Sequence, residues 1–79
     1  MDDIEQLAAE LHADETELQS IAESLTQCSS DPAAILSATR LICSTHNRSG
    51  LTRTDVANHL ASSFKKPLRK LTIYDVRAI

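Results

Sequence analysis

Apolar residues recur at helical spacing along most of this chain, and a residue suited to capping a helix precedes each series. Asp2 precedes the first series. Asp14 precedes the second, with Glu17 three residues later in the position of a capping box. The spacing therefore predicts a helical hairpin over residues 2–28. Its inward side chains are expected to be Ile4, Leu7, Ala8, Leu11, Leu18, Ile21, Ala22 and Leu25.

A third helix is predicted from Pro32 to about His46. Asp31 can cap it, and proline suits a first helical position because the N–H that it lacks would be unpaired there. This segment is the most apolar of the chain, so we expect it to be the central helix. The residues expected to point inward are Ile35, Ala38, Leu41, Ile42 and Cys43.

A corner and a fourth helix follow in the stretch NRSGLTRTDVANHL. Gly50, the only glycine, can adopt the left-handed conformation that ends a helix. Thr52 and Asp55 have the spacing of a capping box, and Leu51 is expected to pack on Val56 as a hydrophobic staple. We expect the buried stripe of this helix to be Val56, Leu60 and Phe64.

The last segment, KKPLRKLTIYDVRAI, fits two structures. The alternation after Lys70 and the β-forming Thr72 and Tyr74 favour a strand. Pro67 at a helix start, with apolar residues after it, favours a helix over 67–79, and this is the interpretation we prefer. One glycine and two prolines do not suit a sheet with many tight turns. The prediction is one all-α domain over residues 1–79, a small bundle of four or five short helices with a helix-turn-helix corner.

Charge divides the chain into two halves. Residues 1–39 hold nine acids and no Lys or Arg, whereas residues 40–79 hold eight bases and two acids, so the halves carry −9 and +6 and sum to −3. This asymmetry indicates two different partners. We expect an anionic partner for the helix-turn-helix-like part of the chain, residues 31–79, which holds all the bases, and another partner for the acidic hairpin. A second interpretation is that the halves neutralise each other within the fold.

The stretch AILSATRLICSTHNRSGLTRTDVANHL, followed by a basic segment, resembles the helix-turn-helix and winged-helix class of DNA-binding domains. The resemblance implies that residues 67–79 form the second helix of the motif, with Thr72 also available to DNA. Phosphates require Lys and Arg, and a helix fits the major groove. The candidate DNA-contacting residues are Arg53, Asn58, Lys65, Lys66, Arg69, Lys70 and Arg77.

The stretch QLAAELHADETELQSI also has the spacing of a helix-turn-helix pair, with His12 where glycine is preferred. Because its surface is acidic, we expect a compact hairpin there and no DNA contact. The alternative function is accordingly a protein-interaction module or inhibitor that binds a basic partner through this hairpin. The acids expected to carry that function are Glu10, Glu15, Glu17 and Glu23.

Enzymatic chemistry and metal binding are not expected. One glycine cannot supply a phosphate-binding loop, and a small Leu-rich bundle seldom offers a catalytic pocket. Cys28, Cys43, His46 and His59 include only one closely spaced pair, so we predict no zinc site and no cofactor. No apolar run reaches the ~20 residues that span a bilayer, and MDDIEQ lacks a signal-peptide pattern. We expect a cytoplasmic protein that forms a homodimer, because so small a core gains from added burial.

Overall fold

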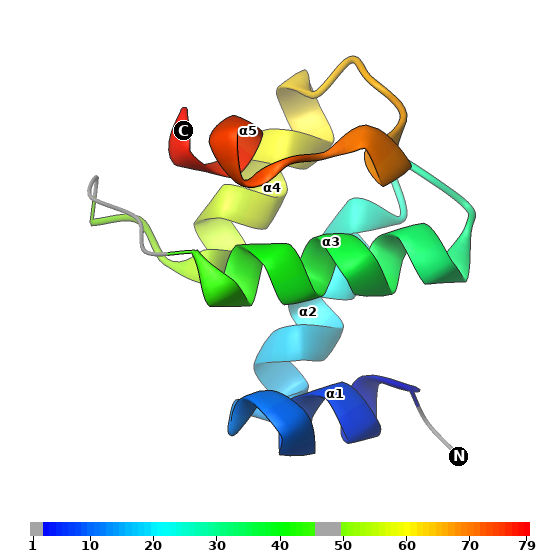
Figure 1. Cartoon of the computed structure of the whole chain (residues 1–79), viewed down its shortest axis with the longest axis vertical. Coiled ribbons are helices and arrows are strands. Elements are labelled where there is room, and N and C mark those ends of the chain that lie inside the picture. The colour runs from blue at the N-terminus through cyan, green and yellow to red at the C-terminus, as the bar shows by residue number, and fades with distance from the viewer. Residues whose placement is uncertain (1–2, 46–49) are drawn as a thin grey trace.

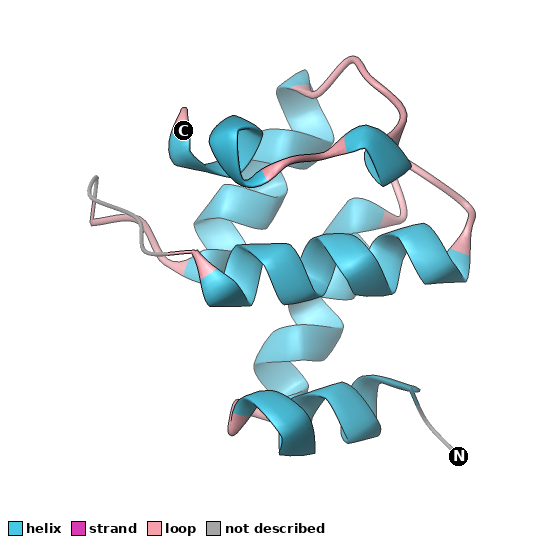
Figure 2. Cartoon of the chain, in the orientation of Figure 1, coloured by secondary structure: helices cyan, strands magenta, loops and turns pink. Residues whose placement is uncertain are grey.

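The computed structural model describes residues 3–45 and 50–79 (Figures 1 and 2). These residues form helices and loops, with no strand among them. The predicted all-α bundle is confirmed. Its elements are α1 (Asp3–Leu11), α2 (Glu15–Leu25), α3 (Pro32–Ser44), α4 (Arg53–Ser63), the 3-10 helix η1 (Leu68–Lys70) and α5 (Ile73–Arg77).

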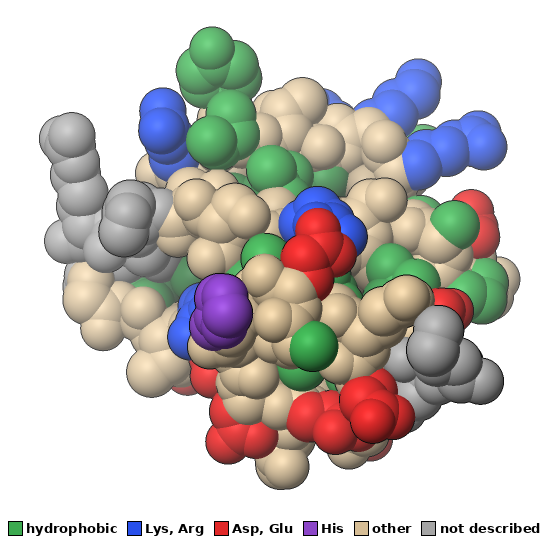
Figure 3. All heavy atoms as spheres, turned by 60° about the horizontal axis from the view of Figure 1, so that its bottom comes forward, with side chains coloured by type: hydrophobic (Ala, Val, Ile, Leu, Met, Phe, Trp, Pro, Cys, Tyr) green, Lys and Arg blue, Asp and Glu red, His purple; other side chains and the backbone are tan. Residues whose placement is uncertain are grey.

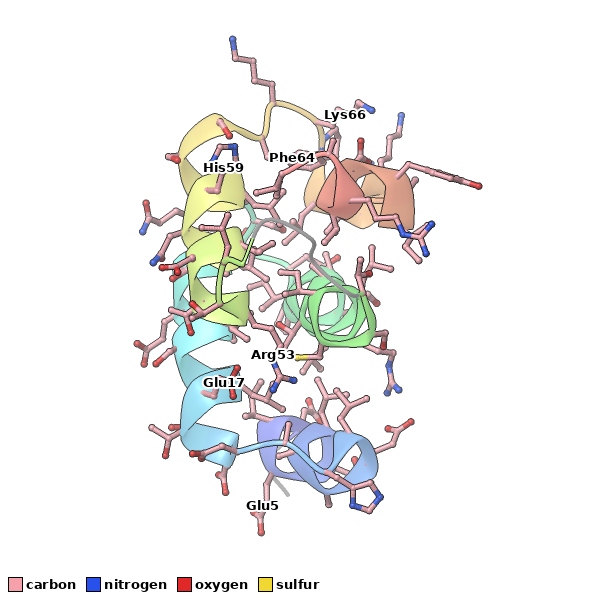
Figure 4. The ribbon with its side chains drawn as sticks, turned by 90° about the vertical axis from the view of Figure 1, so that its left-hand side faces the viewer. Glu5, Glu17, Arg53, His59, Phe64 and Lys66 are labelled. Atoms are coloured by element: carbon pink, nitrogen blue, oxygen red, sulfur yellow. The ribbon has the colours of Figure 1, made fainter. Side chains whose placement is uncertain are left out.

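The helices form two layers. Helices α1, α3 and α5 lie one above another in the nearer layer of Figure 1, and α2 and α4 lie behind them. The perpendicular view of Figure 4 shows the same division, and α2 packs most extensively against α4. Helix α3 contacts each of the other elements, so the prediction that it is central is confirmed.

The core is aliphatic and centres on α2. Leu18, Ile21 and Leu25 are completely buried, and Ile42 and Ala57 cover them from α3 and α4. Full burial of a Leu or Ile side chain contributes about 1.5–3 kcal/mol. The residues predicted to point inward are all buried or packed against this core.

Thr39 is the one fully buried polar residue in the described part of the chain. Its hydroxyl donates to the carbonyl oxygen of Ile35 one helical turn earlier, at 2.8 Å. Thr39 therefore adds no unpaired polar group to the core.

Three of the predicted helix caps are present. Asp14 and Asp31 accept hydrogen bonds from the backbone N–H groups two residues later, and Thr52 forms a complete capping box with Asp55. The capping box predicted for Asp14 and Glu17 is wrong, because Glu17 instead binds Arg53 on α4. Asp2, the cap predicted for the first helix, lies outside the described residues.

The corner between α3 and α4 differs from its prediction in two respects. Gly50 has a φ of 80°, the left-handed conformation expected of it. However, α3 ends at Ser44 with Thr45 as its C-cap, so Gly50 does not cap that helix. Leu51 remains 41% exposed and does not join the core with Val56.

The last segment is helical, as preferred, but it is not one helix over 67–79. Leu71 and Thr72 are extended and separate η1 from α5. The break follows from capping: the Thr72 hydroxyl accepts from the N–H of Asp75, and the Asp75 carboxylate accepts from the N–H of Thr72. A residue that caps α5 in this way cannot continue a helix from η1.

His12 ends α1 in a left-handed conformation, with a φ of 55°, at the position where the sequence pattern favours glycine. The backbone N–H of Ala13 then donates to the carbonyl oxygen of Ala8 at 3.0 Å, as in a helix C-terminal motif. A side chain at such a position costs about 1–2 kcal/mol.

We therefore expect His12→Gly to raise the free energy of unfolding by up to about 1 kcal/mol, since relief of the left-handed penalty exceeds the added entropy of the unfolded chain. Urea denaturation followed by circular dichroism measures this change. The matched control is Ala9→Gly, at an exposed position inside α1, which should lower stability by about 1 kcal/mol. Equal losses in both variants would contradict the prediction.

Candidate nucleic-acid interface

Five of the seven predicted DNA-contacting residues lie close together in the chain after α4, and all five are exposed. We call this set the basic face; it comprises Lys65, Lys66, Arg69, Lys70 and Arg77. In the space-filling view of Figure 3, Lys and Arg gather towards the top of the molecule and Asp and Glu towards the bottom. On the face that Figure 3 shows, the charge division of the sequence is thus also a division of the surface.

Two buried side chains attach this segment to the rest of the fold. Leu68 in η1 and Val76 in α5 are each 2% exposed, and both elements contact α3. Phe64, at the end of α4, packs against the same core. The bases between these anchors are therefore carried on a fixed backbone.

Lys66 and Asp75 link the loop after α4 to α5. The Lys66 Nζ lies 3.5 Å from an Asp75 carboxylate oxygen, and the same carboxylate accepts hydrogen bonds from the Thr72 N–H and hydroxyl. The Thr72 backbone N–H is the main cause that lowers the pKa of Asp75, and the Thr72 hydroxyl and Lys66 add to the effect. The one carboxylate of this segment is thus turned towards the protein, and only 24% of its side chain is exposed.

Arg53 does not belong to the basic face. It lies in the first turn of α4, where its Nε is 2.9 Å from a carboxylate oxygen of Glu17 on α2 (Figure 4). Arg53 therefore connects α4 to α2 at the end of α4 away from Lys65.

Asn58 likewise lies apart from the basic face. Its side-chain oxygen accepts a hydrogen bond from the Ser24 hydroxyl at 2.6 Å, which links α4 to α2. This hydrogen bond uses the side-chain oxygen of Asn58. The side-chain N–H groups of Asn58 take no part in it, and the residue is exposed.

The four acids of the alternative function separate into two pairs. Glu10 forms a two-pronged ion pair with Arg40 at 2.6 and 2.8 Å, and this hydrogen bonding lowers the pKa of Glu10. Glu17 is bound to Arg53. Glu15 and Glu23 are exposed and have no ion pair within the described residues. Internal neutralisation therefore accounts for half of this acidic set.

Sequence reasoning missed the partners of Arg40 and Arg53. Each base lies 30 or more positions from the acid that it binds, at Glu10 and Glu17. Spacing along one helix carries no information about such a contact, because it is set by how α1 and α2 pack on α3 and α4.

The cysteines are free and partly buried. Burial raises the pKa of the Cys28 thiol, and it is also the main cause that raises the pKa of Cys43, against the opposing effect of Arg53. No group of three or more potential metal ligands occurs among the residues described. His46, part of the zinc set considered from the sequence, lies outside them.

Comparison of the chain with family models, with curated protein sequences and with solved structures found no match in any of the three. The helices of residues 3–45 and 50–79 include none long and apolar enough to cross a membrane.

The pKa of Asp75 provides a test of how the basic face is held. Because the folded state lowers this pKa, the ionised carboxyl stabilises α5 at neutral pH, and the stabilisation is lost as pH falls through the folded-state pKa. We expect Thr72→Ala and Lys66→Gln each to raise the Asp75 pKa towards the usual aspartate range. Carbon-detected NMR titration of the side-chain carboxyl measures it. An unchanged titration in both variants would show that neither contact exists in solution.

Proposed function

We propose that this protein is a small DNA-binding regulator whose basic face holds the phosphate backbone. One observation carries the proposal: four bases of the basic face are exposed, lie on the segment after α4 at one end of the fold (Figure 1), and have no ion-pair partner among the described residues. They are Lys65, Arg69, Lys70 and Arg77. Neutralising phosphates with such residues releases condensed counterions, which supplies most of the affinity of a non-specific DNA contact.

The positions of the other charges support the same proposal. Arg40 and Arg53 are each paired with an acid of the hairpin, Glu10 and Glu17, so part of their charge is already neutralised within the fold. The acids of α1 and α2 gather at the opposite end of the surface from most of the Lys and Arg (Figure 3). DNA approaching this molecule is repelled by one end and attracted by the other, so the field orients the encounter.

The proposal rests on phosphate contacts and not on base reading in the major groove. Helix α5 has five residues, which corresponds to a length of about 7.5 Å. A helix of two turns or less offers few side chains to the base edges. Regulation in this form would come from occupying DNA with the basic face.

We expect the affinity for duplex DNA to fall with salt. If all four free bases contact phosphates, log affinity plotted against log salt has a slope of about −3.6. The double variant R69Q/K70Q should reduce that slope to about −1.8. Fluorescence anisotropy of a labelled duplex at several salt concentrations measures both slopes.

The control for this experiment is Arg40→Gln, which removes one positive charge at the end of the molecule where Arg40 pairs with Glu10. It should leave the slope unchanged. Binding that is insensitive to salt, or no binding at low salt, would remove the proposal.

A groove between α1, α2 and the start of α3 favours a second candidate function, protein interaction. Ile4, Ala22 and Leu36 contribute apolar walls, and Asp3 and Glu23 add negative charge. A groove lined by apolar and acidic residues suits an amphipathic helix whose polar face is basic. The occupant that we infer is such a helix from a partner protein.

A synthetic helix with leucine on one face and lysine on the other is the probe for this groove. We expect NMR shift changes at Ile4, Ala22 and Leu36, and weaker binding of the peptide to Glu23→Gln. Glu15→Gln, an equal charge change outside the groove, is the control. Equal effects of the two variants would indicate attraction to the acidic surface as a whole and would contradict a groove site.

A further inference from the structure

Tyr74 is the most exposed large apolar side chain in the described part of the protein, at 76% exposure. A single exposed apolar residue needs no functional explanation. The location of this one is unusual, because it stands on α5 between Lys70 and Arg77 of the basic face. The chain has one Phe, one Tyr and no Trp. Phe64 packs against the core, so Tyr74 is the exposed one of the two.

The backbone that carries Tyr74 is fixed. Val76 is buried against the core, and residues two positions apart on a helix point to nearly opposite sides, so anchoring Val76 turns Tyr74 outward. The capping box of Thr72 and Asp75 closes the first turn of α5, and Lys66 ties that turn to the loop after α4. The ring is thus displayed by a segment whose conformation is already determined.

Exposed bases precede and follow Tyr74 in the chain. Arg77 lies three positions after Tyr74 and therefore on the same side of α5. Arg69 and Lys70 end η1 just before it, and both are exposed. The one nearby acid, Asp75, is occupied by Thr72 and Lys66. An aromatic face set among bases is the combination with which proteins bind single-stranded nucleic acid.

We propose that Tyr74 stacks on an unpaired base of single-stranded DNA while Arg69, Lys70 and Arg77 hold the adjacent phosphates. This inference rests on the proposed DNA-binding function and specifies the form of DNA that the basic face takes. A base inside a duplex is stacked on both sides and offers no free face to a ring on the protein surface. A single strand offers one at every nucleotide, whatever the sequence.

The single tyrosine makes the contact directly measurable. The chain has one Tyr and no Trp, so its tyrosine emission reports on position 74 alone. We expect an oligothymidine strand to quench this emission. An abasic strand of equal length has the same phosphates and no bases. It should bind with a similar salt slope, leave the emission almost unchanged, and bind roughly 5- to 140-fold more weakly for the loss of one stacked base.

Two variants separate stacking from a structural effect. Tyr74→Phe retains an aromatic ring and should bind oligothymidine as tightly as the natural chain does. Tyr74→Ala should lose about as much affinity as removal of the bases does, with an unchanged salt slope and an unchanged far-ultraviolet circular dichroism spectrum. Anisotropy with a labelled strand measures both affinities.

The outcomes distinguish this inference from the function on which it rests. If Tyr74→Ala binds as tightly as the natural chain, or if the abasic strand is bound equally well, stacking is overturned. Salt-dependent binding to duplex DNA would then leave the proposed function standing. If no form of DNA binds at low salt, both proposals fail. A preference for duplex without quenching would also overturn the single-strand assignment.

Discussion

Complete burial of the aliphatic side of α2 is the constraint on which the rest of the structure depends. Leu18, Ile21 and Leu25 have no exposed surface, and they are covered only when α3 and α4 both pack against α2. The core has no aromatic residue at its centre, so many small contacts of Leu, Ile, Val and Ala replace a few large ones. The arrangement leaves one side of each outer helix for charged residues, and these determine what the surface can bind.

Local features of this fold could be predicted from the sequence because local chemistry determines them. A cap such as Asp31 or Thr52 satisfies N–H groups within three residues of itself, and an apolar stripe needs only the period of a helix. The same reasoning located Gly50 in a left-handed conformation. The prediction of one helix over residues 67–79 failed because Thr72 can either continue a helix or cap the next one. Its capping box with Asp75 favours the cap.

The candidate site was predictable only in part for a related reason. The exposed bases after α4 could be identified because a run of Lys and Arg is seldom buried. The roles of Arg53 and Asn58 could not, since each meets a residue of α2 that is more than 30 positions away in the chain. Opposite charges that tertiary packing brings together neutralise each other. A ligand can therefore use mainly the charged side chains that are left without an ion-pair partner. Among the described members of the two candidate sets, those without an ion pair are Lys65, Arg69, Lys70 and Arg77 at one end and Glu15 and Glu23 at the other.

The reactivity of the two partly buried thiols reports local opening of the fold. Cys28 lies beside the end of α4, where its thiol donates to the carbonyl oxygen of Leu60 at 3.5 Å. Cys43 lies on α3, beside Arg53 of α4. Only the thiolate reacts with alkylating agents and oxidants, and burial raises the pKa of both groups, so the closed form reacts slowly at neutral pH. Each thiol becomes more reactive when its segment separates from the neighbouring helix. The alkylation rate of Cys28 therefore reports how often the turn after α2 leaves the end of α4, and that of Cys43 reports how often α3 leaves the first turn of α4.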